Sequence, residues 1–209
     1  MKRLFDVVAS LVALILLAPL LLVIALAIKI TAAGPILYGG ERAGRFGRPF
    51  RMWKFRSMVV GADRRGPAST AVDDVRVTPV GALMRKYKLD ELPQLFNVLR
   101  GEMSLVGPRP QVVWAVARYS DAEREVLSVR PGITDLASLS FANEGEILKG
   151  SADPDRTYYE KIHPEKMRLA LEYVRTRTML LDLWILGATV AAAFGVRPAK
   201  TTPTVDSYL

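Results

Sequence analysis

The chain has 209 residues, enough for one domain with a sizeable core, and 50% of them are hydrophobic. It nevertheless carries a net charge of +8, which predicts an anionic partner such as a lipid surface, nucleic acid or a phosphorylated substrate. It has no cysteine and a single histidine, His163, which excludes disulfides, thiolate chemistry and a histidine-rich zinc site. Any metal would be an oxygen-bound ion such as Mg²⁺.

The N-terminal segment is long and apolar enough to enter a membrane. Residues 7–28 form an uncharged run of 22 residues, and a membrane span needs about 20. A cleaved signal peptide fits less well, because its apolar region is usually about 7–15 residues long. Pro19, after Ala18, lies near the middle, where it removes a backbone hydrogen bond and kinks a helix. Positive charge flanks both ends, and both a straight anchor and a helix that bends back to the same side fit this pattern.

A basic stretch follows. Gly34-Pro35 predicts the end of the first helix, and residues 36–38 predict a short strand. Residues 50–56 alternate apolar and basic, as in a half-buried strand, and residues 61–79 predict a loop. Basic and aromatic residues together are typical of a solvated strand face, a grip on single-stranded nucleic acid, or a contact with lipid headgroups or a pyrophosphate. The apolar segment directly upstream makes nucleic acid the least favoured of these.

The candidate catalytic residues are concentrated around Asp90-Glu91. Apolar residues recur at helical spacing from Leu89 to Leu99, and Pro93 is tolerated only in a first turn, so we expect a helix to begin near Asp90. Both carboxylates would then lie at a helix N-terminus, where free N–H groups and the helix dipole favour negative charge. From the residues alone, Asp90 is either an N-cap or a nucleophile beside a phosphate site.

Two further turns carry arginine beside proline. Arg109 lies between two prolines, which fix the direction of its guanidinium for a bidentate grip on phosphate or for a structural pair with an acid. Arg130-Pro131-Gly132 is either a plain turn or a second anion contact.

The C-terminal third predicts two helices. Residues 165–178 fit one helix, preceded by His163, which we interpret as structural or capping. Residues 179–196 are apolar except for Asp182, and fit either a membrane-surface helix or a core helix; the buried charge argues against a full span.

Seven short motifs occur in order along almost the whole chain. They are Lys2-Arg3-Leu4-Phe5-Asp6, Ala18-Pro19, Gly34-Pro35-Ile36, Lys54-Phe55-Arg56-Ser57-Met58, Leu89-Asp90-Glu91-Leu92-Pro93-Gln94, Met103-Ser104-Leu105-Val106-Gly107-Pro108-Arg109-Pro110 and Arg130-Pro131-Gly132-Ile133-Thr134. Together they resemble the bacterial sugar transferases that are small monotopic phosphoglycosyl transferases, which start lipid-linked glycan assembly. The chain departs from that pattern at Ala18, where serine is common, and at Asp135, where glycine is expected; the second departure leaves the sugar undefined.

The resemblance implies a mainly α fold with minor β (α+β). It implies a re-entrant membrane helix over residues 1–33, broken at Ala18-Pro19, and a compact cytosolic catalytic domain over residues 34–196 with interfacial amphipathic helices. Residues 197–209 are expected to be a polar tail. The protein would lie at the cytoplasmic face of a bacterial inner membrane, in contact with phospholipids. A homodimer is compatible with the sequence, which does not fix the oligomeric state.

The resemblance also implies the chemistry. Asp90 would be the nucleophile and a Mg²⁺ ligand, and Glu91 its catalytic partner. The donor would be a UDP-sugar and the acceptor undecaprenyl phosphate, with UMP released through an aspartyl-phosphosugar intermediate; nucleic acid is not expected as a partner. The residues expected to bind phosphate are Arg109, Lys54, Arg56, Arg85 and Arg130. The competing prediction is a non-catalytic, membrane-anchored basic protein that binds anionic lipid or nucleic acid.

Overall fold

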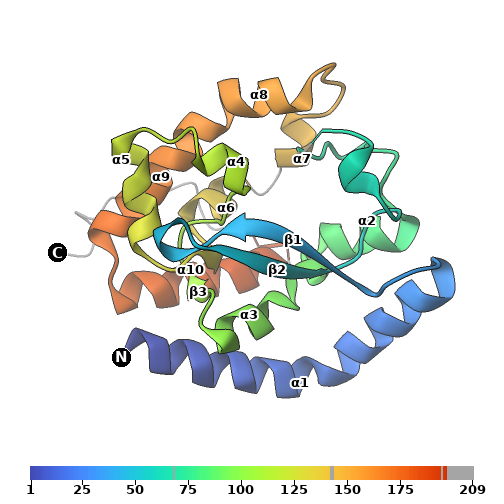
Figure 1. Ribbon diagram of the computed structural model, residues 1–209. Helices are drawn as coiled ribbons and strands as arrows, with labels where there is room; N and C mark the ends of the chain where they lie inside the picture. Colours follow the sequence, from blue (N-terminus) through green and yellow to red (C-terminus); the bar gives the residue numbers. More distant parts are fainter. Residues whose placement is uncertain (68, 142–143, 194, 197–209) are drawn as a thin grey trace.

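The computed structural model describes residues 1–209 apart from 68, 142–143, 194 and 197–209, so the predicted polar tail lies outside the described residues (Figure 1). The described part is mainly helical with a small sheet content, as predicted. Its elements are α1 (Lys2–Thr31), β1 (Leu37–Ala43), β2 (Pro49–Phe55), α2 (Pro79–Lys86), α3 (Gln94–Arg100), β3 (Ser104–Val106), α4 (Val113–Val116), α5 (Asp121–Arg124), β4 (Gly132–Thr134), α6 (Leu136–Ser140), α7 (Glu144–Ile147), α8 (Pro154–Lys161), α9 (His163–Thr176) and α10 (Met179–Ala193).

The helix α1 lies along the base of the molecule and bends near its middle (Figure 1). It contains Pro19, which has no N–H for the helical hydrogen bond. Its buried side chains form one stripe, at Asp6, Ser10, Leu14 and further on Ile24 and Ile28. Among the described residues it is the one helix that is long and apolar enough to cross a membrane. Of its most apolar 18-residue stretch, 11% is buried. An apolar face therefore points away from the domain.

Both ends of α1 are held by the same domain. At its start, the guanidinium of Arg3 donates to the carbonyls of Val98 and Leu99 at the end of α3, at 2.6 and 3.1 Å. At its end, Arg56 donates to the carbonyls of residues 33 and 32, at 2.7 and 2.8 Å. The last carbonyls of a helix need such partners because no helical N–H reaches them. The apolar helix is therefore fixed against one body at both ends.

The strands β1 and β2 form an antiparallel hairpin that runs from Leu37↔Phe55 to Ala43↔Pro49. The predicted strand at 50–56 is confirmed, shifted by one residue. The first strand is longer than predicted, because it continues through the glycines after residue 38. Gly39 lies opposite Trp53, and a Cβ at this position would lie 2.6 Å from the side chain of Arg51. The glycine makes room for these two side chains.

The helix α3 begins at Gln94, and not near Asp90 as predicted. Asp90 lies in a 3-10 turn, Leu89–Glu91, which follows Lys88 with a positive φ of 56°. Pro93 directly precedes α3, where its missing N–H is tolerated. Leu92 and Pro93 both have helical backbone angles, so the chain follows one helical path from the turn into α3.

The main core lies where α1, α3, β3, α9 and α10 meet, and includes Val98, Met103 and Ile185. The strands β3 and β4 pair in parallel, which brings the loop after β3 beside the end of β4. The predicted C-terminal helices are confirmed as α9 and α10.

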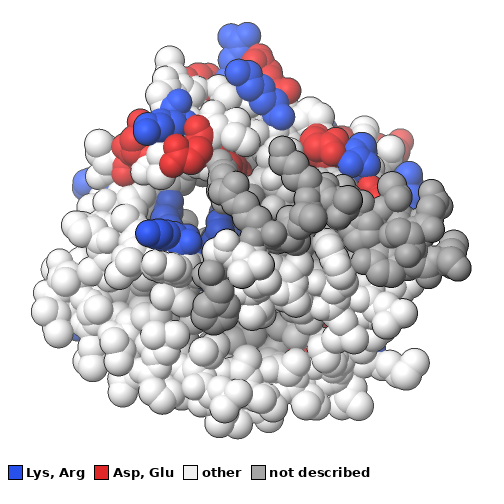
Figure 2. Space-filling model, turned by 180° about the vertical axis from the view of Figure 1, so that it is seen from behind, with Lys and Arg blue, Asp and Glu red and all other residues white. Residues whose placement is uncertain are grey.

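The helix α10 has two apolar faces with different surroundings. Ile185 on one face is buried in the core, while Leu180 and Val190 are exposed. The interpretation of this segment as a helix packed on the core is confirmed for the face that carries Ile185, and the membrane-surface interpretation stays a prediction. Seen from behind, the lower part of the molecule, where α1 lies, shows almost no charged side chains, and the charges gather at the opposite end (Figure 2).

Candidate active site

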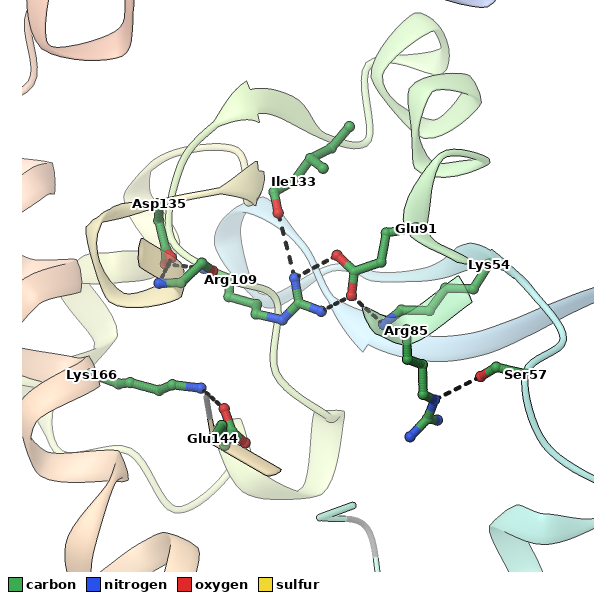
Figure 3. A network of polar contacts seen from close by, with 10 residues as sticks. Lys54, Ser57, Arg85, Glu91, Arg109, Ile133, Asp135, Glu144 and Lys166 are labelled. Carbon is green, nitrogen blue, oxygen red and sulfur yellow. Dashed lines mark hydrogen bonds and ion pairs between the residues drawn. The ribbon is translucent and has the colours of Figure 1, made fainter. Parts of the chain in front are cut away.

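Glu91 lies at the centre of a network of charged side chains (Figure 3). Its carboxylate accepts a hydrogen bond from Lys54 Nζ, on β2, at 2.8 Å. Two nitrogens of the Arg109 guanidinium donate to its two oxygens, one of them at 3.1 Å. Burial alone would raise the pKa of Glu91, but the charges and hydrogen bonds of Arg109 and Lys54 outweigh it and hold this pKa well below its usual range. Glu91 is therefore an ionised anchor for two cations.

The position of Arg109 is fixed from a second side. Its backbone N–H donates to the carboxylate of Asp135 at 3.0 Å, and its guanidinium also reaches the carbonyl of Ile133 at 3.4 Å (Figure 3). Asp135 is buried and also accepts from the N–H of Ser138 at 2.6 Å, which caps α6. The aspartate that departs from the expected glycine thus ties the Arg109 loop to the start of α6.

Asp90 has different surroundings from its neighbour. It is 5% exposed, and its carboxylate has no hydrogen bond or ion pair with any residue that the structure describes. Burial raises the pKa of Asp90, and the nearby charge of Lys54 opposes this rise. The prediction that an α-helix begins near Asp90 is wrong, because Asp90 lies in a 3-10 turn and α3 begins four residues later. What remains is a buried, unpaired carboxylate beside several cations.

Two further cations lie near this network, Arg85 beside the two carboxylates and Arg42 beside Arg109. The Nε of Arg85, on α2, donates to Ser57 Oγ at 2.9 Å, and its other nitrogens have no hydrogen bond within the described part of the chain. Arg42 on β1 is half-buried; burial lowers its pKa, Tyr38 opposes this, and the charge of Arg109 adds to it. Arg42 was not predicted as a site residue, because it comes near Arg109 through a contact between distant parts of the chain: the N–H of Ala43 donates to the carbonyl of Gln111 at 2.9 Å.

Around Asp90 and Glu91, cations outnumber acids. The charges of Lys54, Arg85 and Arg109 act on these two carboxylates, and Glu91 is already hydrogen-bonded to two of the three cations. A surplus of buried positive charge is the property of a site that binds an anion such as a phosphate.

A family model described as bacterial sugar transferase matches residues 1–195. The chain belongs to this family. A UDP-glucose:undecaprenyl-phosphate glucose-1-phosphate transferase from Klebsiella pneumoniae is 40% identical over 196 residues, which cover 92% of this chain and 40% of that protein. The exopolysaccharide production protein ExoY of Sinorhizobium fredii is 37% identical over 206 residues, 91% of this chain and 84% of that protein. An undecaprenyl-phosphate galactose phosphotransferase from Salmonella typhimurium is 43% identical over 160 residues, 69% of this chain and 33% of that protein.

The chain thus spans less than half the length of the Klebsiella and Salmonella family members and most of ExoY. The names of the two longer relatives share undecaprenyl phosphate and differ in the sugar.

Two of the residues expected to bind phosphate, Arg56 and Arg130, do not contact the Glu91 network. Arg56 is buried and donates to the carbonyls that end α1. Arg130 donates through Nε to the carbonyl of Gly101 at 2.8 Å. Of the residues expected to bind phosphate, Lys54, Arg85 and Arg109 are those that the fold gathers around Asp90 and Glu91.

A second group of side chains borders Arg109. Lys166 on α9 pairs with Glu144 on α7 (Figure 3) and lies over the ring of Tyr158, 5.4 Å from its centroid. His163 packs on the same ring, with a centroid distance of 6.1 Å, and faces Glu123 at 3.6 Å. Its contacts are those of a packing residue, as interpreted from the sequence.

The acidic side chains at the site fit one way of binding Mg²⁺ and not another. Within the described residues, no group of three or more acidic or histidine side chains gathers as a protein-only metal site. Mg²⁺ usually binds through one or two carboxylates together with substrate phosphates and water. The unpaired carboxylate of Asp90 fits that mode of binding, whereas Glu91 is already engaged by two cations.

Proposed function

We propose that this chain transfers a phosphosugar from a UDP-sugar to undecaprenyl phosphate and releases UMP. The reaction would be the first membrane step in the assembly of a lipid-linked glycan, such as a capsule, O-antigen, exopolysaccharide or glycoprotein glycan. The observation that carries the proposal is the buried, unpaired carboxylate of Asp90 beside a surplus of cations. The names of the relatives support the substrate classes, and their different sugars leave the sugar open.

The proposed reaction has two steps. An oxygen of the Asp90 carboxylate attacks the phosphorus that carries the sugar, and the bond from this phosphorus to the oxygen of UMP breaks. A phosphate oxygen of the lipid then attacks the same phosphorus, and the bond to Asp90 breaks, which restores the carboxylate and leaves the sugar on a lipid diphosphate. Each step exchanges one oxygen–phosphorus bond for another. Such covalent catalysis predicts ping-pong kinetics.

The cations have separate roles in this proposal. Glu91 holds Arg109 and Lys54, so that both point at the reacting phosphate from fixed positions. Arg85 has unused nitrogens and is proposed to bind the phosphates of the donor directly. Their charges would stabilise the negative charge that spreads over the phosphoryl oxygens in the transition state.

Mg²⁺ is proposed to bind at Asp90 together with the phosphates of the donor, where it would neutralise phosphoryl charge. Treatment with EDTA should then abolish UMP release, and added Mg²⁺ should restore it. Full activity in EDTA would remove the metal from the proposal.

We also propose that α1 is re-entrant and places the site at the cytoplasmic face of the inner membrane. The support is that Arg3 and Arg56 hold both ends of α1 on one domain, and that the helix bends around Pro19. A water-soluble donor and a lipid-borne phosphate would then meet at one interface. The chain has no cysteine, so Leu4→Cys and Val60→Cys can each be labelled singly with an impermeant maleimide. Labels on opposite sides of the membrane would contradict this topology.

The central experiment is UMP release by wild type and Asp90→Asn across a panel of UDP-sugars with undecaprenyl phosphate. Loss of the nucleophile should lower turnover by at least about a thousand-fold. Asp121→Asn, which changes an exposed aspartate on α5, is the matched control and should behave as wild type.

The outcomes separate the two candidate functions. UMP release that persists in Asp90→Asn would show that the nucleophile is misassigned. A wild type that releases no UMP with any donor would favour the non-catalytic basic binding protein instead.

A further inference from the structure

Gln94 is a buried polar residue without a partner. Its side chain is 0% exposed, and neither Nε2 nor Oε1 has a hydrogen bond within the described part of the chain. Buried amides are nearly always hydrogen-bonded, because an unmade bond costs stability. Asn97, in the same helix and equally buried, shows the usual case: it accepts from the N–H of Trp53 at 3.0 Å and donates to the carbonyl of Arg51 at 2.8 Å.

Gln94 lies one turn after Asp90 on the helical path that leads into α3. Residues four apart on such a path lie on the same side, and glutamine can hydrogen-bond to aspartate at this spacing. Asp90 is itself buried and has no hydrogen bond with the described residues. Two polar groups without partners therefore follow each other on successive turns, one of them the proposed nucleophile.

We propose that Gln94 is a positioning residue, which donates its Nε2–H to the oxygen of the Asp90 carboxylate that does not attack phosphorus. The bond would form during turnover and direct the other oxygen at the donor. This inference rests on the proposed function. It explains why an amide is kept in a place where it weakens the resting fold, since functional sites are where such local costs are found.

The test compares Gln94→Met with Ser10→Ala, both as the full chain in lipid nanodiscs. Methionine has a similar length and removes both polar atoms. Ser10 is the matched control, because its Oγ is also buried and unpaired but lies on α1, outside the site. Both changes remove unpaired polar atoms, so both should raise the Tm, by about 2–4 °C for Gln94→Met.

The two variants should differ in activity. Gln94→Met should lower kcat per folded enzyme by about 10-fold or more, with the KM of both substrates unchanged. Ser10→Ala should keep the wild-type kcat. Gln94→Glu keeps the shape and loses the donor, so its kcat should fall at least as far as that of Gln94→Met.

Several results would overturn the assignment. A lower Tm in Gln94→Met would mean that the amide has a structural partner. An unchanged kcat in Gln94→Met or in Gln94→Glu would mean that the donor is not used, and an equal loss in Ser10→Ala would point to a shared packing effect. If wild type is active and Asp90→Asn is not, these results refute the role of Gln94 alone, whereas an inactive wild type refutes the proposed function and this inference together.

Discussion

The start of α1 and the Glu91 network are both buried polar clusters, and they differ in how many of their polar groups have a hydrogen-bond partner. At the start of α1, which we call the α1 joint (Lys2, Asp6, Ser104, Tyr173 and Asp182), each buried acid is paired. Asp6 accepts from Ser104 Oγ at 2.8 Å, and Asp182 accepts from Tyr173 at 2.6 Å and pairs with Lys2 at 2.5 Å. Every bond in this cluster is between parts of the chain.

In the Glu91 network, by contrast, some polar groups have no hydrogen-bond partner. Asp90 has no hydrogen bond with the described residues, and Arg85 uses one nitrogen of its guanidinium. Polar groups that are hydrogen-bonded within the chain stabilise the fold, whereas polar groups without a partner are available to bind a ligand. The difference teaches that the α1 joint should govern stability and the Glu91 network should govern turnover.

The largest expected effect is that of Glu91→Gln. It leaves Lys54 and Arg109 without their common anion in a mostly buried site, where the Glu91 side chain is 14% exposed. UMP release should fall by about 100-fold or more, because both cations lose their fixed positions. The free energy of unfolding should fall by about 3 kcal/mol, as for a buried ion pair with one partner removed. Steady-state assays and denaturant unfolding measure the two effects.

Glu160→Gln is the matched control, since it breaks an exposed ion pair with Arg156 and should leave turnover unchanged. Wild-type turnover in Glu91→Gln would contradict the conclusion that the Glu91 network governs turnover.

Asp6→Ala tests the α1 joint. It removes the acceptor for Ser104 Oγ and for the N–H of Leu105, both of which are buried. The free energy of unfolding should fall by about 2 kcal/mol. Turnover per folded molecule should stay near wild type, and a loss as deep as that of Glu91→Gln would show that the joint also sets the geometry of the site.

The smallest effect is a pH dependence of opposite sign for the two neighbouring acids. The pKa of Glu91 is lowered, so its contribution to stability is complete above its unfolded pKa of about 4.3 and is lost as the pH falls through the folded value. The pKa of Asp90 is raised by burial, so its ionisation costs stability at neutral pH, and this cost disappears as the pH falls.

The stability deficit of Glu91→Gln should therefore shrink by about 1 kcal/mol between pH 7 and pH 4. Any stability gain of Asp90→Asn should shrink over the same range. Thermal unfolding of wild type, Glu91→Gln and Asp90→Asn from pH 7 to pH 4 measures both stability differences. If the stability differences from wild type do not change with pH, the two carboxylates do not differ as proposed.

Local pattern predicted the longest helices and the first hairpin, whereas the short elements α2, α4 to α8, β3 and β4 were not predicted. The 22-residue apolar run gave α1, the alternation at 50–56 gave β2, and the C-terminal periodicity gave α9 and α10. The start of α3 was wrong, because Pro93 is tolerated just before an α-helix as well as within its first turn, and the chain uses a 3-10 turn at Asp90 instead.

The roles of single arginines were harder to predict, because the residue type alone does not show which group the guanidinium will contact. Arg109 pairs with Glu91 across 18 positions of sequence, and Arg56 reaches back 24 positions to the end of α1. Arg42 lies near Arg109 because β1 is hydrogen-bonded to the loop that follows Arg109, from the N–H of Ala43 to the carbonyl of Gln111. The flanking prolines at Arg109 were a local signal of a fixed guanidinium; Arg42 and Asp135 had no comparable signal.

The way α1 is fastened has a consequence for how the protein is made. The helix α1 is synthesised before the groups that hold its start, because the carbonyl of Val98, the hydroxyl of Ser104 and the carboxylate of Asp182 come about 100 to 180 residues later in the chain. When α1 leaves the ribosome, Arg3 and Asp6 therefore have none of these partners. The start of α1 can take its final place only after α10 has been translated, so the placement of α1 and the folding of the domain are completed together.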